Sequence, residues 1–221
     1  MPILALASTK GGSGKSTLAA CIAAELHHRG RNIALLDADP QQTLTAWVDA
    51  DPQQTLTSWR DAGGAGRSLR DAVLHTDASE TGAAWATRQQ ALVVVDTAGV
   101  ATRTLATVLG AADVILIPCR ASPLDAQGAL ATARLAEQYG KPGAAIGAVL
   151  TAVTRIALVD HIRKALEDGG VSVMTSTIGL RVAFAEAALL GSAPCWMGGG
   201  AARAASEIAA LIDELQDVLT P

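Results

Sequence analysis

The sequence is short of aromatic residues, of cysteine and of positive charge, and each shortage narrows the kind of protein that it can encode. Aromatic side chains make up 3% of the 221 residues, so the core must be built from Ala, Val, Leu and Ile. The formal net charge of −4 at pH 7 argues against a uniformly basic nucleic-acid-binding protein, although it allows a local basic patch. No apolar run reaches membrane-spanning length and no signal peptide is evident, which predicts a cytoplasmic protein without a membrane anchor.

The three cysteines, Cys21, Cys119 and Cys195, lie far apart and form neither a CxxC pair nor a metal-ligand spacing. This pattern favours a reducing compartment, because structural disulfides persist in oxidising ones. Cys21 falls on the expected core face of a predicted helix and is interpreted as a small hydrophobic residue.

The chain does contain a glycine-rich motif, STKGGSGKST, at residues 8–17. The motif follows an apolar run, Ile3–Ala7, and opens a segment with helical periodicity, Leu18–Leu26. Strand, glycine-rich turn and helix are the context in which the pattern GxxxxGK[ST] forms a phosphate-binding loop, or P-loop. Backbone N–H groups and the positive end of the helix dipole then face an anion.

The residue types in this P-loop fit ATP and Mg²⁺. Glycines let the backbone approach phosphates closely, a lysine reaches the β- and γ-phosphates, and hydroxyls coordinate Mg²⁺ or bond a phosphate oxygen. The predicted nucleotide-binding residues are Gly11, Gly12, Ser13, Gly14, Lys15, Ser16 (toward Mg²⁺) and Thr17. The motif also carries an additional lysine, Lys10, at its front.

An apolar run at 32–36 leads directly into Asp37-Ala38-Asp39-Pro40. Ligands bind at the C-terminal edge of an open parallel sheet, so Asp37 or Asp39 could hold Mg²⁺ through water or orient the attacking water. Asp39 before Pro40 also fits a helix N-cap, and the two roles are compatible.

A second run, Leu92–Val95, ends in Asp96-Thr97-Ala98-Gly99. After a complete P-loop, such a strand predicts that Asp96 holds the water shell of Mg²⁺. The Gly99 N–H lies where it could sense a γ-phosphate, which would make the state of the protein depend on ATP or ADP.

Residues 37–48 and 49–60 are identical at ten of twelve positions, DADPQQTLT(A/S)W(V/R). Two copies do not make a solenoid, and a local duplication is the simplest explanation. Only the first copy follows a strand-like run. We therefore interpret residues 49–60 as an insert in a single domain spanning 1–221, with Asp49 and Asp51 on its surface.

Alternating strand and helix patterns predict an α/β fold, a P-loop NTPase with a mostly parallel twisted sheet and helices on both faces. Expected strands are 3–7, 32–36, 92–95, 114–117 (ending at Pro118), 145–151 and 171–174. Expected helices are 15–28, 68–74, about 83–90, 123–138, 157–166, 182–190 and 202–219. The last helix is apolar on one face and acidic on the other, which suits core packing better than binding to anionic lipid.

Several motifs resemble the ParA/MinD superfamily of deviant Walker ATPases, and within it small ParA proteins of the ParF kind. The similar segments are KGGSGKST at 10–17, LLDADPQ at 35–41, VVVDTAG at 93–99, IPCRASPLD at 117–125 and AEAALLG at 185–191. The resemblance implies a homodimer closed around two ATP molecules, with Lys10 reaching the partner's phosphates. It implies slow hydrolysis stimulated by a partner protein, with Asp39 activating water and Asp37 and Asp96 supporting Mg²⁺.

The resemblance also implies contacts that the motifs do not fix. Either Thr151 or the pair Thr154-Arg155 matches the base-binding segment, and Pro194 lies in a loop that could contact the base. ATP-dependent, non-specific DNA binding would use basic residues on the dimer surface. The candidates are Arg155, Arg163, Lys164, Arg181 and Arg203.

The leading hypothesis is a nucleoid-associated ATPase that segregates or positions a cargo, such as a plasmid or chromosome locus, with a ParB-like or cargo-adaptor protein as its stimulating partner. The alternative is a MinD-like or other ParA-related ATPase that positions a protein assembly without a role in DNA partition. A membrane-bound MinD type would need a basic C-terminal tail, and EIAALIDELQDVLTP is acidic. A nitrogenase-reductase-like protein would need bridging cysteines, and a dethiobiotin-synthetase-like ligase would leave Lys10 without a role.

Overall fold

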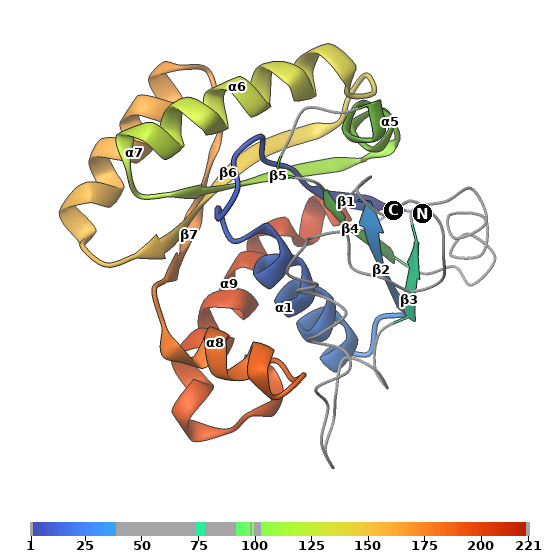
Figure 1. Ribbon diagram of the computed structural model, residues 1–221, viewed down its shortest axis with the longest axis vertical. Coiled ribbons are helices and arrows are strands. Elements are labelled where there is room, and N and C mark those ends of the chain that lie inside the picture. Colours follow the sequence, from blue (N-terminus) through green and yellow to red (C-terminus); the bar gives the residue numbers. More distant parts are fainter. Residues whose placement is uncertain (1, 39–73, 78–91, 98, 100–102, 220–221) are drawn as a thin grey trace.

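The computed structural model describes residues 2–38, 74–77, 92–97, 99 and 103–219. Its centre is a seven-stranded sheet in the order β3-β2-β4-β1-β5-β6-β7, and every pairing is parallel (Figure 1). The strands are β1 (Ile3–Leu6), β2 (Ile33–Ala38), β3 (Leu74–Asp77), β4 (Leu92–Thr97), β5 (Val114–Arg120), β6 (Ala145–Val153) and β7 (Val173–Gly179). The P-loop follows the central strand β1, between β4 and β5.

Helices cover both faces of the sheet, as the sequence predicts (Figure 1). One face packs against α1 (Lys15–His28), α8 (Val182–Leu189) and α9 (Ala202–Leu219). The other packs against α5 (Arg103–Ala111), α6 (Pro123–Tyr139) and α7 (Ile156–Asp168). Among the described helices, none is long and apolar enough to cross a bilayer.

Alternation along β5 divides its side chains between these two layers. Val114 and Leu116 belong to the core beneath α1, whereas Ile115, Ile117 and Cys119 belong to the core beneath α6. Successive side chains of a strand point to opposite faces, so a central strand buried on both faces is apolar throughout. The same rule places Arg120, the last residue of β5, on the α1 face.

The expectation that this strand ends at Pro118 is wrong, because β5 continues to Arg120 and pairs with β6 throughout. Proline lacks a backbone N–H and normally interrupts a central strand. Here the pairing with β1 ends at Leu116, whose carbonyl accepts a bond from the Ala7 N–H at 3.0 Å. Alternate residues turn toward the same neighbour, so Pro118 faces the side where β1 has already ended.

Two other strands also have boundaries that differ from those expected from the sequence. Leu74, expected to close a helix, instead begins β3, and β7 starts at Val173 and runs to Gly179. Helix α5 was not predicted. The rest of the helix expected at 68–74, the helix near 83–90 and the whole insert at 49–60 lie outside the described residues.

Glu214 of α9 forms hydrogen bonds with the backbone of the edge strand β7. Its carboxylate accepts N–H bonds from Thr175 at 2.6 Å and from Ser176 at 2.9 Å. Burial raises the pKa of Glu214, but the bonds from Ser176 and Thr175 outweigh it and hold the pKa below its ordinary value. A carboxylate of lowered pKa stabilises the fold above its unfolded-state pKa, and this contribution is lost as the pH falls through the folded-state pKa.

We expect Glu214→Gln to lower the melting temperature by about 2–4 °C at pH 7, the shift that about 1 kcal/mol produces in a chain of this size. The deficit should shrink as the pH falls below the ordinary glutamate pKa of about 4.3 and through the lowered folded-state pKa, because the wild-type carboxylate then becomes protonated as well. Thermal melts between pH 7 and pH 3 measure it, with Asp217→Asn on the same helix as the control. A deficit independent of pH would show that Glu214 acts through packing alone.

Candidate functional site

The P-loop has the backbone geometry that its glycines predict. Gly12 and Gly14 have φ values of 73° and 91°, in the left-handed region that favours glycine. Gly14 is the N-cap of α1 and provides no side-chain cap, and its carbonyl accepts the first helical bond from the Leu18 N–H at 2.9 Å. The N–H groups of the first helical turn are therefore available to an anion.

Two further features of the loop fit a bound phosphate chain. The Ser13 hydroxyl is buried and has no hydrogen-bond partner among the described residues. Lys15 is buried, with 8% of its surface exposed. The buried Ser13 hydroxyl is unfavourable without a partner unless a ligand or water supplies one.

The loop after β4 lies directly against the P-loop. A Cβ built on Gly99 would lie 3.4 Å from the Gly11 N atom, so the two loops are within van der Waals contact of one another. The role of Gly99 near a γ-phosphate stays a prediction. On the same strand, the Thr97 hydroxyl donates to the Leu6 carbonyl at 2.8 Å and ties the end of β4 to β1.

Asp37 and Asp96 are register partners on the adjacent strands β2 and β4. The fold thus brings both predicted Mg²⁺ residues to the same level of the sheet, near its C-terminal edge, and Asp96 is 5% exposed. Ser16, in the first turn of α1, is half-buried. Within the described residues, no cluster of three or more His, Cys, Asp or Glu forms a ready-made metal site. Asp39 lies outside the described residues.

Lys10 is held by its own chain. Its Nζ lies 2.6 Å from Asp125 Oδ1 at the start of α6, with the two side chains 43% and 12% exposed. Ser122, the N-cap of α6, also hydrogen-bonds the Asp125 carboxylate. Burial raises the pKa of Asp125, but the bonds from Lys10 and Ser122 outweigh it and hold the pKa below its usual range. Gly128 lies beside the lysine, since a Cβ there would be in van der Waals contact with Lys10 Cβ, at 3.6 Å.

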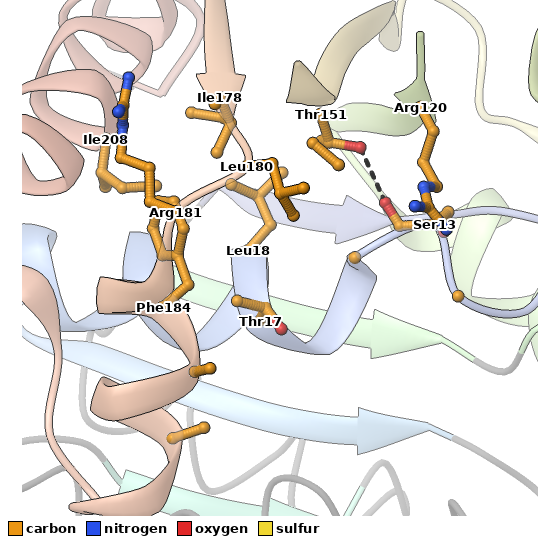
Figure 2. A pocket seen from close by; sticks show the side chains of 16 residues that line it. Ser13, Thr17, Leu18, Arg120, Thr151, Ile178, Leu180, Arg181, Phe184 and Ile208 are labelled. Atoms are coloured by element: carbon orange, nitrogen blue, oxygen red, sulfur yellow. Dashed lines mark hydrogen bonds between the residues drawn. The ribbon is translucent and has the colours of Figure 1, made fainter. Parts of the chain in front are cut away.

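A cavity of about 380 Å³ opens beside the P-loop, between the ends of β6 and β7 and helix α8 (Figure 2). The Thr151 hydroxyl donates to the Ser13 carbonyl at 3.0 Å and so connects β6 to the P-loop. Ala152, next in the chain, has φ of 50°, a strained value for a residue other than glycine. The cavity is lined by Gly12, Ser13, Gly14, Thr17, Leu18, Arg120, Thr151, Ala152, Ile178, Gly179, Leu180, Arg181, Phe184, Ala185, Ala188 and Ile208.

The three predictions for the base-contacting segment have different surroundings. Thr151 is buried and lines the cavity. Thr154 and Arg155 are exposed and are not among its described lining residues. Pro194 is buried in a short 3₁₀ turn, Pro194–Trp196. Base contact through any of them remains a prediction.

Four of the five basic residues considered for DNA contact interact within the chain. Arg163 donates to the carbonyls of Val173 at 3.1 Å and Met174 at 2.8 Å, which joins α7 to β7. The carboxylate pairs are Lys164 with Asp168, and both Arg181 and Arg203 with Glu207. Lys164 and Arg203 nevertheless have side chains 76% and 81% exposed, and Arg155 is exposed at the N-cap of α7. These last three keep access to an external polyanion.

Three contacts at the site could not be predicted from the sequence: Lys10 with Asp125, Thr151 with Ser13, and Arg120 on the cavity wall. The IPCRASPLD segment contains Arg120 and Asp125, but its pattern does not show that one faces α1 and the other Lys10. The only local signal was Ser122-Pro123 before Asp125, which marks the start of a helix.

The fold and the loop together define a P-loop nucleotide-binding protein. A family model described as VirC1 protein matches residues 1–188, and the chain therefore belongs to the VirC1 family, within the ParA/MinD superfamily of P-loop ATPases. This confirms the resemblance to ParA and MinD proteins that the motifs indicate.

Two curated relatives are similar to this chain over most of its length. Protein ParA of Rhizobium radiobacter is 31% identical over 83% of this chain and 81% of its own length. The "Maintenance of carboxysome distribution protein A" of Halothiobacillus neapolitanus is 30% identical over 96% of this chain and 95% of its own. Among solved structures, the septum site-determining protein MinD of Pyrococcus horikoshii OT3, complexed with Mg-ADP, superposes with a TM-score of 0.68. It is 14% identical, with 99% of this chain and 98% of that chain covered, and it supports the fold alone.

Proposed function

We propose that this protein is an ATP-dependent switch that dimerises with ATP and Mg²⁺, binds DNA without sequence preference in that state, and segregates or positions a cargo. The observation that carries the proposal is Lys10, a second lysine in the P-loop whose charge is directed away from the loop and onto Asp125. Lys15 is buried in the loop, where it can serve the nucleotide of its own chain. Lys10 is therefore the cation available to a second nucleotide.

The contact with Asp125 suggests how dimerisation depends on ATP. In a single chain Lys10 is neutralised by Asp125, at 2.6 Å. In the dimer it would leave Asp125 for the phosphates of the partner's nucleotide, which carry more negative charge than one carboxylate. A γ-phosphate adds to that charge, so ATP would favour the exchange more than ADP does. Size-exclusion chromatography with light scattering, with ATP, ADP or no nucleotide, tests this proposal, which predicts a dimer with ATP only.

Asp125→Asn is expected to make ATP-dependent dimerisation easier, because Lys10 no longer has to leave a carboxylate. Since the lysine is 43% exposed, the pair represents about 1 kcal/mol or less, or up to about fivefold in the equilibrium constant per subunit. Sedimentation equilibrium with ATP measures the change. Asp113→Asn, which removes the partner of Lys141 elsewhere on the sheet, is the matched control. A weaker dimer in Asp125→Asn would mean that Asp125 aligns Lys10 for its task.

Asp39→Ala is expected to trap an ATP-bound dimer, because Asp39 would position or activate the water that attacks the γ-phosphate. Loss of a general base slows such a step by about 10²–10⁴-fold. Phosphate release assays, with dimerisation followed in the same samples, report both effects. Hydrolysis at the wild-type rate would assign the role to Asp37 or to the second DADP copy.

Positioning of a protein assembly rather than DNA is the second candidate function. It is favoured by the relative whose printed name refers to carboxysome distribution, and its similarity covers 96% of this chain. The two functions share the ATP switch and differ in cargo. A stimulating partner that carries the cargo, ParB-like or another adaptor, is part of both proposals.

A further inference from the structure

We propose that Arg120 binds the phosphate chain of the nucleotide in its own subunit, as a second cation of that subunit beside Lys15. The inference rests on the proposed function, since it assumes that the P-loop holds ATP or ADP. It assigns a role to a residue that the P-loop motif does not include.

The position of Arg120 follows from the sheet. Arg120 is the last residue of β5 and the register partner of Thr151 at the end of β6. Both side chains lie on the α1 face, and Thr151 uses that position to bond the Ser13 carbonyl of the P-loop at 3.0 Å. Figure 2 shows the Arg120 side chain extending from the end of β5 toward the P-loop near Ser13. Arg120 and the P-loop residues Gly12, Ser13 and Gly14 line the same cavity.

The charge of Arg120 is uncommitted within the part of the chain that the structure describes. Arg29, Arg181 and Arg203 each pair with a carboxylate there, whereas Arg120 forms no ion pair with a described residue. The positive charge of Arg120 helps to lower the pKa of Asp125, but that carboxylate is already bonded by Lys10 and Ser122. Arg120 is also exposed to solvent, so a ligand in the cavity can reach it.

The chemistry of the neighbours identifies the ligand. The Ser13 hydroxyl has no described partner, and the first-turn N–H groups of α1 are donors without acceptors from a side-chain cap. The cavity is lined by Arg120 and the P-loop residues Gly12, Ser13, Gly14 and Thr17, and otherwise mostly by apolar side chains. A guanidinium beside a phosphate-binding loop fits an anion with several oxygens, because guanidinium binds phosphate through two parallel N–H bonds. Lys10 lies on the α6 side of the loop and Arg120 on the α1 side. Arg120 therefore suits the chain's own phosphates, whereas Lys10, which is paired with Asp125, would serve the partner's.

The test is the affinity of the full-length protein for fluorescently labelled ADP, by anisotropy, at concentrations where light scattering shows a monomer. We expect Arg120→Ala to weaken ADP binding about tenfold, and Arg120→Lys to recover part of the loss because the charge remains but the paired donors do not. Arg134→Ala, an exposed arginine on α6, is the matched control and should bind as wild type. Thermal melts confirm that each variant is folded.

The double variant Asp125→Asn/Arg120→Ala distinguishes a phosphate contact from an effect through Asp125. A tenfold loss relative to Asp125→Asn alone supports the direct contact. Disappearance of the loss in that background, or wild-type affinity in Arg120→Ala, would overturn it. If the wild-type protein binds neither ADP nor ATP, the proposed function fails, whereas failure of the Arg120 variants alone leaves that function standing.

Discussion

Lys15→Ala is expected to bind ATP about 100-fold more weakly than the wild-type protein. Lys15 is 8% exposed at the start of α1, within the loop whose backbone N–H groups would surround the phosphates. Removing it deletes a charged hydrogen bond made away from solvent, a contribution of up to about 3 kcal/mol. Hydrolysis and ATP-dependent dimerisation should be lost with binding, because both require the nucleotide.

Isothermal titration calorimetry with ATP and Mg²⁺ measures this change. Lys141→Ala removes a lysine that pairs with Asp113, away from the P-loop, and should leave the affinity unaltered. Lys15→Arg keeps the charge and tests whether the loop demands the shape of lysine. Unchanged ATP affinity in Lys15→Ala, with the protein folded, would mean that the P-loop does not hold the phosphates.

Lys10→Ala is expected to abolish ATP-dependent dimerisation while the single chain still binds nucleotide. Lys10 is oriented toward α6 and Asp125 rather than into the loop, so its removal leaves Lys15, Ser16 and Thr17 in place. Light scattering with saturating ATP should show less than about 10% dimer, the result of losing about 3 kcal/mol of interaction from two symmetric contacts.

Loss of Lys10 also leaves the Asp125 carboxylate without its principal partner, which could disturb α6 by itself. The double variant Lys10→Ala/Asp125→Asn removes that charge and should still fail to dimerise. Dimerisation of either variant at the wild-type level would contradict the proposal that Lys10 bridges two subunits.

Most of the fold could be predicted because the signals are local. Residues Leu92–Val95 of β4 form a continuous apolar run buried on both faces. Helix α9 shows its core face through Ile208, Leu211, Ile212 and Leu215, all of which are buried. The P-loop was predictable for the same reason, since its glycines, lysine and hydroxyl lie within ten residues. Strand β3 was not predicted, because its sequence, LHTD, is short and mostly polar. It forms a strand by pairing in parallel with β2 at the edge of the sheet.

The parts of the site that could not be predicted are contacts between distant segments. Lys10 and Asp125 are 115 positions apart, and only the packing of α6 against the P-loop shows that they meet. Ser13 and Thr151 are 138 positions apart and meet because β6 ends beside the P-loop. The position of Arg120 depends on β5 continuing past Pro118. If the strand ended at Pro118, strand alternation could not assign Arg120 to a face of the sheet.

The proposed control of DNA binding by ATP is tested by measuring affinity for a random-sequence duplex with ATP, ADP or no nucleotide over a series of salt concentrations. We expect tight binding with ATP alone, weakening steeply as salt rises because phosphate contacts release counterions. Absence of DNA binding in every state, with ATP-dependent dimerisation intact, would contradict the DNA-binding role and leave a switch that acts on a protein assembly.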